Sequence, residues 1–596
     1  MGMGMLRSWG GLAATFLFTA TLSLTAGHTA RGAAFTVTNT LDSGPGSLRQ
    51  AVLDADASVG LDIITFSIPG PAPHTIALFS SVDITDPVII DATTQPGFAG
   101  TPVVELVGFA MAPPGPALVI TSGGSTVRGL AIGGFDTAIS INGGAAGGNV
   151  IAGDYIGTDF TGELARFNFR GIVITELSGN KIGGTNAADR NVISANYTGI
   201  LTIRHTINNV IQGNFIGTDA TGSLPLGNND GIVFLAGFTT NRVGGTAPGA
   251  GNVIAANHND GIEFNGSAGN NTQGNWIGTN QTGAAGLGNG NNGIFVNFGC
   301  CNQIGGTSPA ARNVISGNGG DGILISHPFF GTTVRGNWIG LSTSGSALGN
   351  AHYGIDIHAT NPLDVAGQGD SLLANVISAN AAAGGSAIRM TEGANRTVVQ
   401  GNLVGTDPSG TAPVGNFGDG VIVDGAPRTT IGGPGAGNTI AFNAGAGVNV
   451  LSGNGASISE NSIFANGGLG IDLAPAGVTP DDRRDGDIGA NDLQNFPDLK
   501  SAPSTGTSGS VHGILDSVPN SAFRIEIYVN ASCDPSGNGE GRTLVGIVDV
   551  TTSNGGIAPF NVPAAFAPGD YLTATATDVN GSTSEFSGCL QATAAD

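Results

Sequence analysis

Side chains suited to acid–base chemistry occur at close spacing in one short segment and in the repeat that follows it. Asp356 and His358 alternate within GIDIH, and Arg389 occupies the matching place in the next repeat. Residues two apart on a strand point to the same side, and neighbouring strands lie about 4.8 Å apart. The three side chains therefore predict a catalytic cluster with a carboxylate, an imidazole and a guanidinium that stabilises negative charge.

Further polar side chains surround this cluster in the sequence. The candidate substrate-binding residues are His352, Tyr353, Glu392, Asp424 and His327. Two other interpretations stay open, a ligand-binding face without catalysis and an ordinary solvated surface. An exposed Asp–Arg pair usually contributes less than about 1 kcal/mol to stability.

An acidic run near the C-terminus, DDRRDGDIGANDL, carries closely spaced oxygen ligands. The candidate metal ligands are Asp485, Asp487, Asn491 and Asp492. Ca²⁺ prefers carboxylate and amide oxygens, so the run is a candidate Ca²⁺ site. It lacks the EF-hand spacing and the terminal Glu, and the alternative is a solvated acidic linker.

A long internal repeat indicates which elements position these residues. The segment NVISAN begins at Asn191, and related segments begin at Asn252, Asn313, Asn375 and Asn438, at spacings of 61, 61, 62 and 63 residues. A shorter repeat of about 30 residues lies inside it, in which Gly and an aliphatic residue open a short run such as GIVFL, GIEFN or GILIS. Apolar and variable positions alternate in these runs, which predicts strands with one buried face.

Short strands at a constant step, with Gly and Asn turns and no helical periodicity, predict an all-β solenoid. The Gly-Ile runs give eleven rungs from Gly171 to Leu473, and shorter coils precede them. The Asn residues of the repeat should stack as ladders in which each side chain bonds to the next coil. The IGTD loops carry Asp159, Asp219 and Asp407, whose spacing is too wide for a shared Ca²⁺ ion and favours turns.

The opening FTVTNTLDSGPGSLRQAVLDADASVGLDIITFSIPG resembles the N-terminal cap of secreted bacterial right-handed parallel β-helix repeat proteins. The resemblance covers residues 35 to about 590. It implies a cap over residues 35–62, with a helix from Ser47, and a right-handed parallel β-helix over 63–475. Carbohydrate-active members of this group carry their sites on an outward strand face, but the pectate-lyase and polygalacturonase signatures are absent here.

The period stops near Pro475, and two further regions follow. Residues 476–497 are rich in Pro, Asp and Gly, which is typical of a linker. Residues 498–596 contain four alternating runs that fit a small β-sandwich. Within them DVNGSTSEFSG resembles the last hairpin of the Ig-like modules at the ends of such proteins, so we expect an Ig-like module.

The N-terminus and the cysteines indicate the compartment. Residues 1–34 are similar to a signal peptide, and no later segment has 18 consecutive apolar residues, so we expect a secreted or cell-surface protein without a membrane span. Cys533 and Cys589 are expected to form a disulfide in that compartment. The adjacent Cys300 and Cys301 form either a strained disulfide or two free thiols.

Charge narrows the possible partners. The chain has 20 Lys and Arg against 43 Asp and Glu, a net charge of −23. Such a balance argues against nucleic acid and anionic lipid as partners.

These observations lead to two hypotheses for the function. The protein binds an extracellular polysaccharide and, if it is an enzyme, cleaves it as a lyase or a hydrolase. Alternatively, it is a non-enzymatic adhesion or structural β-helix protein.

Overall fold

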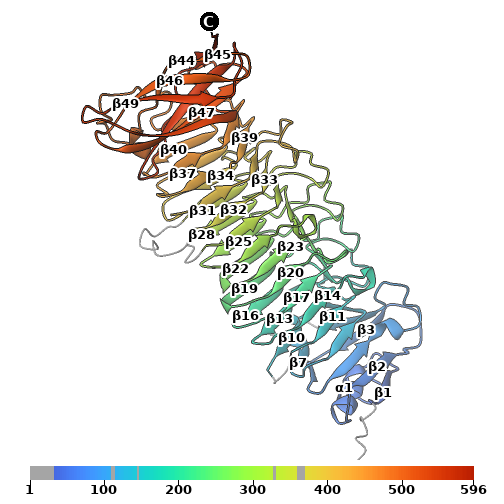
Figure 1. Ribbon diagram of the computed structural model, residues 1–596. Coiled ribbons are helices and arrows are strands. Elements are labelled where there is room, and N and C mark those ends of the chain that lie inside the picture. Colours follow the sequence, from blue (N-terminus) through green and yellow to red (C-terminus); the bar gives the residue numbers. More distant parts are fainter. Residues whose placement is uncertain (1–31, 109–114, 144–146, 327–330, 359–368, 596) are drawn as a thin grey trace, which may run out of the picture.

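The protein is seen here as a computed structural model, which describes residues 32–108, 115–143, 147–326, 331–358 and 369–595. Its main body is an elongated stack of coils (Figure 1). Every third strand along the chain enters the same sheet, which gives three long sheets in which all strands are parallel. The predicted right-handed parallel β-helix is confirmed.

Sheet 1 has fifteen strands. Its strands are β1 (Ala34–Val37), β2 (Asp62–Phe66), β5 (Val88–Asp91), β8 (Thr126–Arg128), β11 (Val150–Ala152), β14 (Lys181–Gly183), β17 (Val210–Gln212), β20 (Arg242–Gly244), β23 (Asn271–Gln273), β26 (Gln303–Gly305), β29 (Thr333–Arg335), β32 (Ser371–Leu373), β35 (Val398–Gln400), β38 (Thr430–Gly432) and β41 (Ser457–Ser459).

Sheet 2 has fourteen strands, eleven of which are the predicted Gly-Ile runs. Its strands are β4 (Val82–Ile84), β7 (Pro116–Ile120), β10 (Thr137–Asn142), β13 (Asn168–Thr175), β16 (Asn196–Ile203), β19 (Asp230–Phe238), β22 (Ile262–Ala268), β25 (Ile294–Asn297), β28 (Ile323–Ser326), β31 (Ile355–His358), β34 (Ile388–Met390), β37 (Val421–Asp424), β40 (Val448–Ser452) and β43 (Ile471–Leu473).

Sheet 3 also has fourteen strands, most of them two or three residues long. Its strands are β3 (His74–Leu78), β6 (Val104–Gly108), β9 (Leu130–Gly133), β12 (Tyr155–Ile156), β15 (Val192–Ile193), β18 (Phe215–Ile216), β21 (Val253–Ile254), β24 (Trp276–Ile277), β27 (Val314–Ile315), β30 (Trp338–Ile339), β33 (Val376–Ile377), β36 (Leu403–Val404), β39 (Thr439–Ala441) and β42 (Ser462–Phe464).

Asn side chains fix the register from one coil to the next. Asn191 donates from Nδ2 to Oδ1 of Asn214 at 3.0 Å, and Asn214 donates in turn to Asn252 at 3.0 Å. This ladder continues to Asn461, and a second ladder runs from Asn168 to Asn466. The predicted ladders are confirmed. They satisfy buried amides without placing charge in the interior.

The N-terminal end of the coils is closed by the helix α1 (Leu48–Asp56), beside β1 and β2 in Figure 1. Leu48, Ala51 and Val52 are buried against the first coils. Ser47 caps the helix by accepting from the backbone N–H of Gln50 at 3.2 Å. The Gln50 side chain donates to Asp54 at 2.8 Å instead of turning back to Ser47, so Ser47 and Gln50 form only half of a capping box.

The acidic residues of the IGTD loops serve their own turns. Asp219 accepts from the backbone N–H of Leu224 at 3.0 Å and from the hydroxyl of Thr221 at 2.8 Å. Asp407 makes equivalent bonds to Ser409 and Ala412. Hydrogen bonding by the Ala412 N–H, and next by Ser409, lowers the pKa of Asp407 to about 2. These bonds agree with the turn interpretation.

A sandwich of two mainly antiparallel sheets covers the other end of the coils (Figure 1). The four predicted runs are β46 (Gly509–Asp516), β47 (Ala522–Asn530), β48 (Thr543–Thr551) and β50 (Tyr571–Asp578). The strands that were not predicted are β44 (Asp498–Ser501), β45 (Pro503–Ser504), β49 (Ile557–Ala564), β51 (Leu590–Gln591) and β52 (Thr593–Ala594). Tyr528 and Phe586 pack into the hydrophobic core of the solenoid. The sandwich therefore acts as a second cap. Its Ig-like character stays a prediction.

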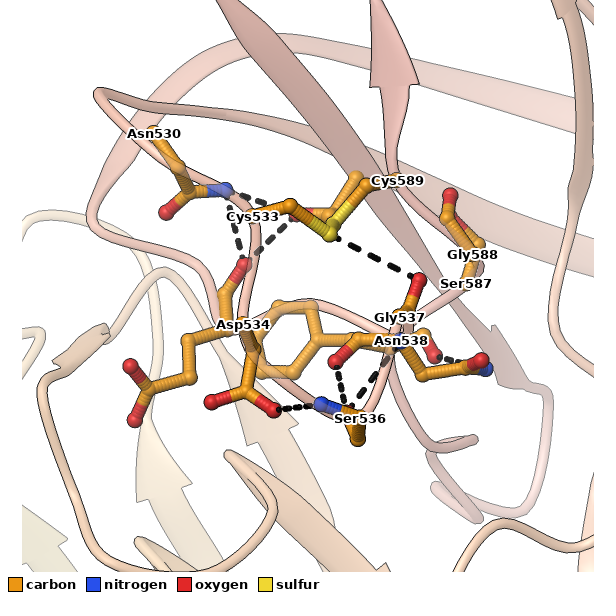
Figure 2. Close-up of a disulfide and its surroundings, with 12 residues drawn as sticks. Asn530, Cys533, Asp534, Ser536, Gly537, Asn538, Ser587, Gly588 and Cys589 are labelled. Carbon is orange, nitrogen blue, oxygen red and sulfur yellow. Dashed lines mark hydrogen bonds between the residues drawn. A yellow bond between two sulfur atoms is a disulfide. The ribbon is translucent and has the colours of Figure 1, made fainter.

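The cysteines fall into two groups. Cys533 and Cys589 form the expected disulfide, which ties the loop around Asp534 to the C-terminal segment (Figure 2). Cys300 and Cys301 are two free thiols whose sulfur atoms lie 3.0 Å apart. Burial, with Cys301 nearby, raises the pKa of Cys300 to about 12.

The two remaining predicted segments are the signal peptide and the linker. The expected signal peptide, residues 1–34, lies outside the described residues except for residues 32–34. The expected linker, residues 476–497, contains a short 3₁₀-helix, η4 (Ala490–Leu493). Within the described residues, no helix is both long and apolar enough to cross a bilayer.

Candidate functional site

The predicted cluster lies on the outward face of sheet 2. Asp356 of β31 pairs directly with Arg389 of β34, and Leu324 of β28 pairs with Asp356 from the other side. Ile355 and Ile357 are fully buried inside the coil, which directs the alternate side chains outward. The strand register therefore places Asp356 and Arg389 side by side, as the repeat spacing predicted.

Asp356 binds both of its neighbours at once. Arg389 donates from Nε to Oδ1 at 2.8 Å and from Nη2 to Oδ2 at 2.6 Å. Nδ1 of His358 lies 3.2 Å from Oδ2 of the same carboxylate. The Asp356 side chain is only 3% exposed, whereas Arg389 and His358 are 31% and 29% exposed. Asp356 thus lies beneath two side chains that reach the surface.

Tyr353 completes the support of the guanidinium. The Cζ atom of Arg389 lies 4.3 Å from the centroid of the Tyr353 ring. A guanidinium above an aromatic face is attracted by the ring quadrupole. Arg389 is therefore held from two sides, by the carboxylate of Asp356 and by the ring of Tyr353.

These contacts fix the charge of the pair. Burial alone would raise the pKa of Asp356, but the hydrogen bonds from His358 and Arg389 outweigh burial and lower it overall. The hydrogen bond to Asp356 raises the pKa of Arg389. Asp356 is consequently an ionised carboxylate and Arg389 a cation at neutral pH.

Asp321 belongs to the same cluster and was missed in the sequence analysis. It accepts from the backbone N–H of Tyr353 at 2.9 Å. Burial, and next the negative charge of Asp356, raises the pKa of Asp321 to about 6. The sequence did carry a signal, because Asp230, Asp260 and Asp321 each precede the Gly-Ile pair of their strand.

The predicted substrate-binding residues lie at different places around this cluster. His352 is exposed directly before Tyr353, and its charge lowers the pKa of Asp321. Glu392 is exposed after β34, and Asp424 at the end of β37 accepts from the hydroxyl of Ser452 at 2.7 Å. Among the described residues, no hydrogen bond or ion pair joins Glu392 or Asp424 to the cluster. His327 lies outside the described residues.

The predicted metal ligands separate into two groups. Carboxylate oxygens of Asp485 and Asp487 lie within 4.8 Å of each other and of a third residue, Asp482. Asn491 is instead buried, with Nδ2 donating to backbone carbonyls of Ala456 and Thr583 at 2.9 and 2.8 Å. Asp492 accepts from Asn454 and Ser582. The structure thus places Asp482 in the candidate Ca²⁺ site, while Asn491 and Asp492 join the sandwich to the solenoid. Ca²⁺ binding stays a prediction.

Comparison with known proteins yields neither a matching family model nor a matching curated protein. Solved structures with a similar fold include tailspike protein 2 of an Escherichia coli O157:H7 bacteriophage, 11% identical over 91% of this chain with a TM-score of 0.31. The present chain spans 65% of that tailspike.

Two further structures are similar at the same level. The A-module of an Azotobacter vinelandii mannuronan C-5 epimerase is 14% identical over 72% of this chain and 94% of its own, with a TM-score of 0.33. An alginate lyase from a Paenibacillus species is 14% identical over 58% of this chain and 94% of its own, with a TM-score of 0.26. A likeness this remote carries no statement about the activity or substrate of this chain.

Proposed function

We propose that the protein binds an extracellular polysaccharide on the outward face of sheet 2 and cleaves it at the cluster of Asp321, Asp356, His358 and Arg389. One observation carries this proposal: a buried carboxylate holds a base and a cation that both reach the surface. Other buried carboxylates, such as Glu105 and Glu526, also hold an exposed arginine, but among the described residues only Asp356 holds a histidine as well. This arrangement is typical of sites that perform acid–base chemistry.

In this proposal His358 is the base. Asp356 faces Nδ1 of His358, so the neutral ring keeps its proton on Nδ1 and offers Nε2 to the substrate. The carboxylate also stabilises the imidazolium that forms when Nε2 takes up a proton. Both carboxylate oxygens of Asp356 are already bound by His358 and Arg389, so Asp356 acts as a positioning residue.

Arg389 and Asp321 supply the other two functions. Arg389 stabilises negative charge that develops on the sugar as the base acts. Asp321 donates a proton to the glycosidic oxygen that leaves, since its pKa of about 6 keeps part of it protonated near neutral pH. In an elimination, His358 removes a proton from carbon and a double bond forms as the C–O bond breaks. In hydrolysis, His358 removes a proton from water, which adds to the sugar.

The non-enzymatic alternative also has support in the structure. Uncharged Asn ladders run through most of the coils and make a rigid rod with capped ends, which suits a stalk or an adhesin. In that case the bonds of Asp356 would merely join two rungs. The two functions differ in whether any polysaccharide is cut.

The test is a cleavage assay on a panel of acidic and neutral polysaccharides, with and without Ca²⁺. New reducing ends together with products that absorb ultraviolet light would establish a lyase, and reducing ends alone a hydrolase. Cleavage should be lost in His358→Ala and Arg389→Ala. Arg204→Ala is the matched control, because Arg204, directly after β16, forms an exposed ion pair with Glu176, directly after β13. No product from any polymer would contradict the proposal.

A further inference from the structure

A column of large side chains runs along the outward face of sheet 3 at every second rung. Its members are Tyr155, Phe215, Trp276, Trp338 and Leu403, and they alternate with Val192, Val253, Val314 and Val376. Two rungs correspond to about 9.6 Å. This face is separate from the cluster on sheet 2 and plays no part in the cleavage chemistry proposed above.

The column forms the floor of a groove. One cavity of about 380 Å³ is lined by Trp276, Pro309, Arg312 and Trp338. A second cavity of about 380 Å³ is lined by the same Pro309, Arg312 and Trp338, and also by Arg335. Because the two cavities share three lining residues, they lie next to each other on the same face of the solenoid.

Trp276 differs from Phe215 and Trp338 because no arginine among the described residues stacks on its ring. Arg190 and Arg312 directly precede the NVI segments at Asn191 and Asn313, and they stack on the rings of Phe215 and Trp338 at 4.2 Å. The residue at the same place before Asn252 is Gly251, which lies beside Trp276. A Cβ atom on Gly251 would lie 3.1 Å from the Trp276 ring. Trp276 is therefore half-buried, has no arginine from the described part of the chain stacked on its ring and lines the first cavity.

Two arginines in the groove have a nitrogen atom without a hydrogen-bond partner. The Nε atoms of Arg312 and Arg335 are buried without a hydrogen-bond partner. Among the described residues, no carboxylate forms an ion pair with either arginine. Buried polar groups in proteins are nearly always hydrogen-bonded, so such exceptions call for a ligand or ordered water. The groove thus carries two cationic side chains in a protein of net charge −23.

We propose that this groove binds an extended acidic polysaccharide, one that carries uronate carboxylates. The apolar faces of pyranose rings stack on indole rings, which accounts for Trp276. Guanidinium groups bind carboxylates through charge-assisted, often bidentate hydrogen bonds, which accounts for Arg312 and Arg335. The two-rung spacing of the column is close to the length of a disaccharide unit, so one extended chain can contact successive members. Only the choice of polysaccharide as ligand class rests on the proposed function.

Tryptophan fluorescence can report this groove selectively. The chain has three tryptophans, namely Trp9, Trp276 and Trp338, and Trp9 lies outside the described residues. In a Trp9→Phe chain, all tryptophan emission arises from the groove. Titration with oligogalacturonate or oligomannuronate should change this emission saturably, whereas uncharged cello-oligosaccharides should bind at least tenfold more weakly.

Variants and salt test the role of the arginines. The double variant Arg312→Gln/Arg335→Gln should weaken acidic ligand binding at least tenfold, and the control Arg204→Gln should not. In the protein that retains both arginines, the affinity for the acidic ligand should fall as NaCl is raised from 50 to 500 mM. This measurement does not depend on whether the double variant folds. The inference is overturned if no acidic oligosaccharide binds, if uncharged ones bind equally well, or if neither arginine removal nor salt weakens binding.

The two proposals can fail independently. Asp356→Asn should abolish cleavage and leave the fluorescence titration unchanged, because it lies on sheet 2. Cleavage without any groove response would overturn this inference alone. Saturable binding in the groove without cleavage of any polymer would overturn the proposed enzymatic function and support the inference that the groove binds an acidic polysaccharide.

Discussion

Arg389 donates two parallel hydrogen bonds to Asp356 of the neighbouring strand in sheet 2, from Nε at 2.8 Å and from Nη2 at 2.6 Å. Removing one partner of such a pair leaves the other charge without its bonds. We expect Arg389→Gln to lower the free energy of unfolding by about 2 kcal/mol, since the buried Asp356 would stay ionised and poorly paired.

A double-mutant cycle measures this relationship in urea unfolding. Arg389→Gln, Asp356→Asn and their combination should give a coupling energy of about 1 to 2 kcal/mol. The exposed pair of Arg204 and Glu176 supplies the control cycle, with a coupling below about 1 kcal/mol. Equal coupling in the two cycles would mean that Asp356 and Arg389 are an ordinary surface pair.

A buried carboxyl at the start of an Asn ladder makes stability depend on pH. Asp154 is fully buried, and its backbone N–H donates to Asn191 at 2.9 Å, but its Oδ2 has no hydrogen-bond partner. Burial raises the pKa of Asp154 to about 8. The folded state therefore takes up a proton that the unfolded state releases near pH 4, and stability falls as the pH rises from about 4 to 8.

Asp154→Asn should remove this dependence. An amide can join the ladder as Asn191 does, so the variant should be more stable than the native chain by about 2 kcal/mol at pH 8. The difference should shrink at pH 5, and thermal unfolding at the two pH values measures it. A variant that is less stable at pH 8 would show that Asp154 has an ionic partner.

The predicted Ca²⁺ site gives a separate test by thermal unfolding. Burial, with a smaller contribution from the charges of Asp487 and Asp482, raises the pKa of Asp485 to about 6. A bound cation would relieve the repulsion between these carboxylates. Because a ligand that binds only the folded state stabilises it, Ca²⁺ at 100 times its Kd should raise the free energy of unfolding by about 2.7 kcal/mol. Asp485→Asn should abolish the effect, and Asp549→Asn on β48 of the sandwich should not. An unchanged Tm with Ca²⁺ and with EDTA would refute the site.

Most of the fold could be predicted because the sequence is periodic. Rungs repeat at constant spacing, so the positions of Asp356 and Arg389 in their runs were enough to place them side by side. The ladders followed from Asn at a fixed place in each repeat. The same logic failed for the sandwich, where β49 lies between two correctly predicted strands and carries prolines.

The site was only partly predictable, because sequence spacing does not show burial or the path of a loop. Asp321 joins the cluster because its carboxylate caps the backbone of Tyr353, a contact that no alternation pattern shows. Asn491 lies close to Asp487 in sequence, yet the backbone turns it toward Thr583 of the sandwich. The column of large side chains on sheet 3 was not predicted, because its members lie about 61 residues apart. Each of them nevertheless precedes the repeated Ile-Gly or Val-Gly pair.

The rate of polysaccharide cleavage as a function of pH tests the central claim most directly. If Asp321 is the proton donor, the rate should fall as the pH rises above about 6, where its carboxyl loses the proton. Asp321→Asn should cut the rate by about 10²- to 10⁴-fold and remove that alkaline decline. A rate that is flat from pH 5 to 8, or an Asp321→Asn variant with the native rate and profile, would contradict the assignment of this cluster as the catalytic site.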